Sequence, residues 1–121
     1  GWTVLSTGGN LKEGSFALVG SRAERFAEDF HADWMFFSSK GLDRTSGITD
    51  TNDADASIKR AMISASKKVC LAVDGSKFDR VSFANIVGWN RISLVMTDLP
   101  PRAEWQSFFE EKGVECLYPE V

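Results

Sequence analysis

The stretch Val69-Cys70-Leu71-Ala72-Val73-Asp74-Gly75-Ser76-Lys77 joins a continuous apolar run to a polar turn. Such an apolar run is typical of a strand that is buried on both faces of a parallel sheet. The polar residues would then lie at the carboxyl end of the strand, where ligands bind in open α/β sheets. This stretch therefore predicts both the fold class and the edge of the sheet that carries function.

Strand-like and helix-like segments alternate on both sides of this stretch. A second apolar run at Trp34–Phe37 is also expected to be buried on both faces, and a helix is expected between the two runs, from Asp53 to Lys67. Further strands are expected at Trp2–Leu5, Phe16–Val19, Ile92–Met96 and Val114–Tyr118, with a short amphipathic stretch at Val81–Val87. This alternation predicts one α/β unit, a largely parallel sheet with helices on both faces.

The remaining helices and the longest loop have local signals. Ser21 followed by Glu24 matches a capping box, so a helix should begin there. Pro100-Pro101 should open the last helix and Gly113 should end it. The segment from Ser38 to Asn52 is rich in Gly, Ser, Thr and Asp and is expected to be a long loop, and such loops are usually functional. The inner stripe of the Asp53–Lys67 helix is expected at Ile58, Ala61, Met62 and Ala65.

Composition limits the classes of function. The chain has 121 residues, 43% of them hydrophobic and 26% charged, which suits one folded domain. Its net charge of -3 argues against direct nucleic-acid binding, because such domains are usually basic. Two cysteines and one histidine predict no metal cluster, and no cofactor is expected. No apolar run approaches the roughly 20 residues of a membrane span and no signal peptide is recognised, so no membrane partner and a cytoplasmic setting are expected.

Candidate ligand-binding residues lie at the expected strand ends. Asp43 and Asp74 can accept hydrogen bonds from hydroxyl groups, and Lys77 can pair with a phosphate. Gly41 and Gly47 would let the backbone approach a ligand closely. Alternatively, Asp74 could cap the turn after its strand, and Lys77 could be a solvated surface lysine.

Asp55 and Lys59 stand four residues apart at the start of the expected Asp53–Lys67 helix, on the same face. The simpler interpretation is an exposed ion pair worth a few tenths of a kcal/mol. Their position after a polar loop, at a helix N-terminus, also suits an anion site. Both interpretations remain open from the sequence.

Five short segments follow one another along the chain in a characteristic order and spacing. They are Thr7-Gly8-Gly9-Asn10-Leu11, Ser39-Lys40-Gly41-Leu42-Asp43, Gly47-Ile48-Thr49, Ala56-Ser57-Ile58-Lys59-Arg60-Ala61-Met62 and Asp74-Gly75-Ser76-Lys77-Phe78. Together they resemble the C-terminal effector-binding domain of DeoR-type transcriptional regulators, and the resemblance covers about residues 3 to 98. It implies a fold like that of ribose-5-phosphate isomerase and the CoA transferases. It also implies a non-catalytic sensor that binds a phosphorylated sugar or sugar alcohol and controls repression of a carbohydrate-utilisation operon.

The resemblance also implies which residues line the site. With the two glycines and with Thr49 and Ser76 from the matching segments, the expected ligand-binding set is Gly41, Asp43, Gly47, Thr49, Asp55, Lys59, Asp74, Ser76 and Lys77. Asp55 stands where the family usually has glutamate, and Gly75 where it usually has serine. Residues 1–121 are expected to form one partial effector domain, lacking the helix-turn-helix through which DNA would be bound and the first, phosphate-holding part of the sensor domain.

Two other functions remain as alternatives. A sugar-phosphate isomerase could use Asp43 or Asp55 as the base, with Lys77 stabilising an enediolate. The chain could instead serve only as an oligomerisation module. In either a sensor or a module, missing strand–helix units should leave apolar surface uncovered, so the chain is expected to form a homo-oligomer.

Overall fold

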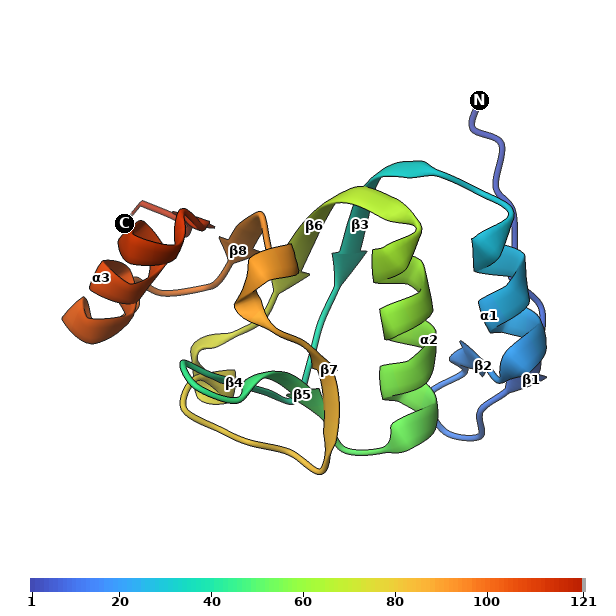
Figure 1. The fold of residues 1–121 in the computed structure, drawn as a ribbon, viewed down its shortest axis with the longest axis horizontal. Helices are drawn as coiled ribbons and strands as arrows, with labels where there is room; N and C mark the ends of the chain where they lie inside the picture. The colour runs from blue at the N-terminus through green and yellow to red at the C-terminus, as the bar shows by residue number, and fades with distance from the viewer. Residues whose placement is uncertain (121) are drawn as a thin grey trace.

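Four parallel strands form the main sheet in the computed structural model, which describes residues 1–120 (Figure 1). The strands are β3 (Ala32–Phe37), β6 (Ser66–Ala72), β8 (Leu94–Met96) and β9 (Glu115–Leu117), and they lie in that order across the sheet. Phe37 lies beside Leu71, and Leu71 lies beside Val95, so the strands end at the same edge. The expected α/β class with a largely parallel sheet is confirmed.

Three helices connect or flank these strands. They are α1 (Ser21–Glu28), α2 (Asp53–Ser64) and α3 (Ala103–Lys112), and Figure 1 shows α1 and α2 side by side at one end of the molecule with α3 at the other. Gly113 ends α3 with φ 71°, as expected from the sequence. The expected capping box of α1 is wrong, because Gly20 occupies the N-cap without a side-chain hydrogen bond. Glu24 instead accepts a hydrogen bond from the hydroxyl of Ser57 in α2, at 2.7 Å.

The segment expected to be one long loop contains two strands, so that prediction is wrong. β4 (Gly41–Asp43) and β5 (Gly47–Asp50) form a hairpin, and β7 (Ala84–Val87) pairs with β5 in antiparallel fashion. Leu42 and Ile48 are fully buried and provide the apolar side of this sheet. Gly47 closes the hairpin with φ 83°, and a Cβ there would lie 2.7 Å from the carbonyl oxygen of Val87.

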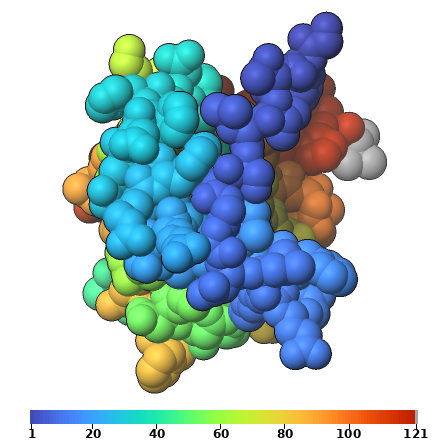
Figure 2. All heavy atoms as spheres, turned by 90° about the vertical axis from the view of Figure 1, so that its right-hand side faces the viewer, coloured from blue at the N-terminus to red at the C-terminus, as the bar shows by residue number. Residues whose placement is uncertain are grey.

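The N-terminal segment also differs from the prediction. Trp2–Leu5 forms no strand in the described structure, and Trp2 and Val4 are 96% and 81% exposed. Figure 2 shows this dark-blue segment running across the surface next to α1. The only pairing near it is the short antiparallel ladder of β1 (Asn10–Leu11) with β2 (Leu18–Val19) among residues 1–120. An extended segment without a partner strand has no ladder of backbone hydrogen bonds to fix it.

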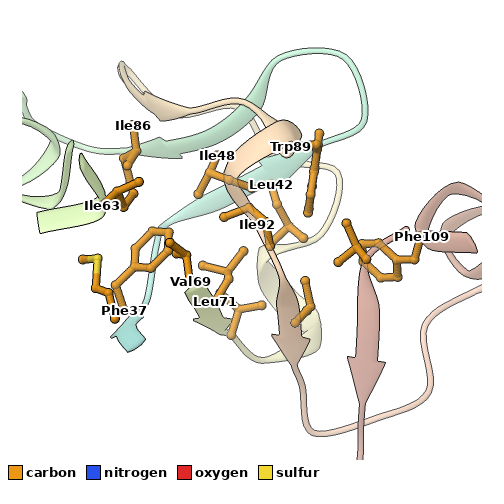
Figure 3. Close-up of a cluster of buried hydrophobic side chains, with 14 of the residues drawn as sticks. Phe37, Leu42, Ile48, Ile63, Val69, Leu71, Ile86, Trp89, Ile92 and Phe109 are labelled. Atoms are coloured by element: carbon orange, nitrogen blue, oxygen red, sulfur yellow. The ribbon is translucent and has the colours of Figure 1, made fainter. Parts of the chain in front are cut away.

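The two faces of the parallel sheet are unequally covered. On one face, Met35, Phe37, Val69, Leu71 and Val95 join the main apolar cluster, part of which is drawn in Figure 3. Both α2 and α3 contribute to this same cluster, through Ile63 of α2 and Trp105 and Phe109 of α3.

On the opposite face, which we call the outer face, the large side chains contact solvent. Trp34 and Phe36 of β3 are 40% and 65% exposed, and Met96 and Leu117 are also exposed. The prediction that Trp34–Phe37 is buried on both faces is therefore wrong. β3 is an edge strand, and only its alternate residues Met35 and Phe37 point into the core.

The helix α2 is shorter than expected and presents a different stripe. It ends at Ser64, and β6 begins two residues later at Ser66. Its buried residues are Ala56, Ile58 and Ile63, whereas the expected inner residue Met62 is 36% exposed. The helix packs against α1 on one side, and against the parallel sheet and the β4–β5–β7 sheet on the other. Its apolar residues are therefore shared among three partners.

Candidate functional site

Lys59 of α2 joins three parts of the chain at the carboxyl edge of the parallel sheet. Its ammonium nitrogen Nζ lies 2.6 Å from the carboxylate oxygen Oδ2 of Asp50 and 2.7 Å from the carbonyl oxygen of Ser38. Asp50 ends β5 and is only 2% exposed. Ser38 follows the last residue of β3. The ammonium group therefore holds a buried carboxylate and the end of a parallel strand together.

Asp55, one turn before Lys59, pairs with a different lysine. Its Oδ2 accepts hydrogen bonds from Lys12 Nζ at 2.6 Å and from the side-chain amide of Asn52 at 2.7 Å. Asn52 also caps α2 by accepting from the backbone N–H of Asp55 at 2.9 Å. The exposed Asp55–Lys59 ion pair considered from the sequence is thus absent from residues 1–120, and each residue instead joins the helix to another segment.

The surroundings of Asp55 lower the pKa of its carboxyl group. Burial alone raises the pKa, but the hydrogen bonds from Lys12 and Asn52, with the nearby charges of Lys12 and Lys59, outweigh it and favour the carboxylate.

Stability should therefore depend on Asp55 in acid. A carboxyl whose pKa is lower in the folded state stabilises the fold above its ordinary pKa of 3.8, and this stabilisation is lost as the pH falls through the lowered value. At neutral pH we expect Asp55→Asn to unfold with a free energy smaller by about 1 kcal/mol. Urea titrations of both proteins from pH 7 to about pH 3 should show this difference shrinking as the pH falls. A constant difference across that range would contradict the assignment.

The turn after β6 places Asp74, Ser76 and Lys77 together. Asp74 caps the short 3-10 helix η1 (Gly75–Lys77), accepting from the backbone N–H of Ser76 at 2.8 Å and from its hydroxyl group. The Ser76 hydrogen bonds hold the pKa of Asp74 below its ordinary value. Lys77 Nζ lies 3.4 Å from the Ser76 hydroxyl oxygen and 3.9 Å from Asp74 Oδ2. Asp74 does cap the turn, and Lys77 lies beside it.

The ends of three neighbouring parallel strands meet at this edge of the sheet. β3 ends next to Ser38, β6 next to the Asp74 turn, and β8 next to Asp98. Asp98 Oδ1 accepts from the backbone N–H of Gly75 at 2.8 Å, which ties the second and third ends together. We call this group the strand-end site, and it consists of Ser38, Asp50, Lys59, Asp74, Ser76, Lys77 and Asp98. Its lysines can pair with an anion and its carboxylates can accept from hydroxyl groups.

Four of the expected residues belong to the β4–β5 hairpin. Asp43 Oδ2 accepts from the backbone N–H groups of Ser46 at 2.7 Å and Thr45 at 3.0 Å, and these bonds lower its pKa at the hairpin tip. Gly47 lies opposite Asp43. At the other end of the hairpin, Gly41 approaches the backbone of Arg80 so closely that a Cβ would lie 2.5 Å from its carbonyl oxygen.

Thr49, paired with Gly41, is fully buried, and its hydroxyl accepts from the backbone N–H of Ser82 at 2.8 Å. The structure thus gives all four hairpin residues a part in shaping the hairpin. Ligand contact by Gly41, Asp43, Gly47 and Thr49 stays a prediction.

Several residues of the site were missed by sequence reasoning. Asp50 was included in the expected loop, although its place directly after a buried isoleucine–threonine pair could have marked a strand end. Asp98 follows an expected strand but was not chosen. Outside the strand-end site, the pairing of Lys12 with Asp55 was also missed, because the two residues are 43 positions apart and no local pattern could connect them. No group of three His, Cys, Asp or Glu side chains that could hold a metal ion occurs within residues 1–120.

Comparison with known proteins places the chain in a family. The model of the DeoR C terminal sensor domain matches residues 1–99, and the chain belongs to this family. The chain is 38% identical to the HTH-type transcriptional regulator YulB of Bacillus subtilis (strain 168) over 79% of its length and 37% of that protein. It is 37% identical to the HTH-type transcriptional regulator GlpR of Haloferax volcanii over 94% of its length and 45% of that protein.

A third relative is the glycerol-3-phosphate regulon repressor of Escherichia coli (strain K12), with 29% identity over 81% of this chain and 39% of that protein. The chain thus spans less than half the length of these relatives. Their names describe transcriptional regulators and the family is one of sensor domains, so the expected assignment to a sensor rather than an enzyme is confirmed. None of the helices described in residues 1–120 has the length and apolar character needed to cross a membrane.

Proposed function

We propose that this chain is the ligand-sensing domain of a DeoR-type transcriptional repressor and that its effector is a phosphorylated sugar or sugar alcohol. The observation that carries the proposal is the strand-end site, where two lysines and several carboxylates gather at the carboxyl edge of a parallel sheet. A phosphorylated polyol offers both an anion and hydroxyl groups, which is the combination that these side chains can bind. The name of the Escherichia coli relative, a glycerol-3-phosphate regulon repressor, supports this ligand class.

Different residues would bind different groups of the ligand. Lys77, with a side chain 26% exposed, would pair with the phosphate, because its neighbours Asp74 and Ser76 hold it only loosely. Asp98 and Asp74 would accept hydrogen bonds from hydroxyl groups. Lys59 would mainly hold the site together and not bind the ligand, since its ammonium group already pairs with Asp50 and the carbonyl oxygen of Ser38. The remaining expected residues complete the proposed site from the β4–β5 hairpin (Gly41, Asp43, Gly47 and Thr49), from the first turn of α2 (Asp55) and from η1 (Ser76).

Regulation would follow from a population shift. A ligand that binds one arrangement of the domain more tightly than another increases its population. In the proposed repressor this shift would change how a helix-turn-helix outside these residues meets the operator of a carbohydrate-utilisation operon. The proposed protein acts in the cytoplasm as a homo-oligomer, and the exposed outer face of the parallel sheet supports association with another surface.

Thermal unfolding in the presence of phosphorylated probes tests the proposal. We expect glycerol 3-phosphate, ribose 5-phosphate or glucose 6-phosphate to raise the melting temperature, and the unphosphorylated counterparts to have little effect, because a ligand bound only by the native state stabilises it. Lys77→Met should weaken binding of an active probe about tenfold or more.

Lys67→Met provides the matched control, because Lys67 is exposed beyond the end of α2 and lies outside the strand-end site. It should leave the affinity unchanged. Equal stabilisation by phosphorylated and unphosphorylated probes, or an unchanged affinity of Lys77→Met, would contradict the proposed role of the phosphate.

A further inference from the structure

Asp79, two residues after Lys77, has a backbone conformation that few residues other than glycine adopt. Its φ is 61°, in the left-handed region, where the Cβ of most residues comes too close to the backbone and where aspartate occurs more often than most. Phe16, with φ 58°, is the other such non-glycine residue in the described chain, and it is 75% exposed at the tip of the β1–β2 hairpin. Strained backbone persists where the surroundings over-determine it, so the contacts of Asp79 are informative.

The start of α3 holds the Asp79 carboxylate. The indole N–H of Trp105 donates to Oδ1 at 3.1 Å, and the guanidinium group of Arg102 donates to Oδ2. Trp105 is fully buried, so its indole presents a fixed donor. Two donors from the start of α3 therefore bind the two oxygens of a single carboxylate, whose residue holds a left-handed conformation.

The residues on both sides of Asp79 are fixed as well. The ring of Phe78 packs edge-on against Trp105, with 5.0 Å between ring centroids. Arg80 donates its backbone N–H to the carbonyl oxygen of Leu42 at 3.3 Å. The chain that leaves the Asp74–Lys77 turn is thus attached first to α3 and then to the β4–β5 hairpin. Asp79 is the point at which its direction changes.

We propose that Asp79 is a positioning residue for the turn Asp74–Lys77, which we call the ligand turn. By holding a left-handed conformation against Trp105 and Arg102, it fixes where η1 ends and hence where Lys77 stands at the strand-end site. Its own carboxylate is engaged by α3 and does not serve as a ligand contact. The same contacts join the ligand turn to α3, so a movement of Lys77 toward a phosphate would also displace this helix. The inference rests on the proposed function, because it treats Lys77 as a ligand residue.

Three variants separate the backbone from the side chain. Asp79→Asn keeps an acceptor for Trp105 and a residue type that tolerates the left-handed region. Asp79→Gly adopts the conformation freely but loses both anchors. Asp79→Ala loses both anchors and carries the strain. Phe16→Gly is the control, because it changes the other left-handed residue without touching the ligand turn.

Two measurements on the intact protein test the inference. In hydrogen exchange, peptides covering residues 74–80 should exchange about tenfold faster in Asp79→Gly and Asp79→Ala than in the wild type, because local opening becomes easier. Asp79→Asn and Phe16→Gly should exchange at nearly the wild-type rate there. The affinity for an active probe such as glycerol 3-phosphate should fall about tenfold in the glycine variant and largely recover in the asparagine variant.

The outcomes are distinct. Wild-type exchange of residues 74–80 in Asp79→Gly would overturn the inference, and so would faster exchange with an unchanged affinity, because Asp79 would then only stabilise the loop. If no phosphorylated probe binds the wild type, the proposed function fails. Exchange in the absence of ligand then still decides whether Asp79 fixes the turn.

Discussion

Replacing Lys59 by methionine should destabilise the fold by about 3 kcal/mol, because the change leaves the carboxylate of Asp50 without its partner. Asp50 is 2% exposed, and the Lys59 ammonium group lies 2.6 Å from its Oδ2. A buried charge without compensation costs far more than an exposed ion pair contributes. The free energy of unfolding from urea titration at neutral pH measures this effect.

The double variant Lys59→Met with Asp50→Asn should recover part of the loss, since it removes the unpaired charge. The side chain of Lys59 is 23% exposed, so some solvent can reach its position and moderate the penalty. Lys67→Met, at an exposed lysine near the start of β6, should change stability by less than about 0.5 kcal/mol. A loss in Lys59→Met no larger than in Lys67→Met would show that Asp50 is solvated in solution.

Trp105→Ala should cost about 4 kcal/mol, the range found when large aromatic side chains are removed from a core. Trp105 is fully buried and packs against Phe78, Trp89, Phe108 and Phe109 with ring centroids 5.0 to 5.7 Å apart. Its removal leaves a cavity in the cluster and takes one donor from Asp79. Thermal or urea unfolding followed by far-UV circular dichroism gives the free energy.

Trp34→Ala is the matched control, because it deletes the same side chain from the outer face of the sheet. Trp34 is 40% exposed, stacks with Phe36 and lies below the Lys68 ammonium group, so we expect a smaller loss of about 1 kcal/mol. Equal losses for the two tryptophans would indicate that the outer face is as well covered in solution as the core.

The central apolar run and the glycine at the end of α3 were parts of the fold that the sequence could predict. The run at Val69–Val73 became a central strand, and Gly113 ended α3 because a left-handed residue is needed there. The hairpin of β4 and β5 could not be predicted in the same way, because its strands have three and four residues and lie among turn-forming residues. Such short strands are held by partners elsewhere in the chain, here β7, and not by their own pattern.

Burial and side-chain pairing depended on the same long-range information. The four apolar residues Trp34–Phe37 do not reveal whether their strand is central or at an edge, and the edge position of β3 exposes Trp34 and Phe36. The spacing of Asp55 and Lys59 indicates that they share a helix face. It does not reveal that Lys12 and Asp50 approach this face from other segments and take one partner each.

The outer face also contains a cysteine, Cys70, whose thiol is buried. Cys70 lies on this face between Phe36 and Leu94, is fully buried, and has a raised pKa because burial disfavours the thiolate. Phe36 and Leu94 are its register partners in the two adjacent strands, and Phe36 is itself 65% exposed. With its sulfur buried and its thiolate disfavoured, Cys70 should react slowly with alkylating reagents although it lies on the exposed face of the sheet.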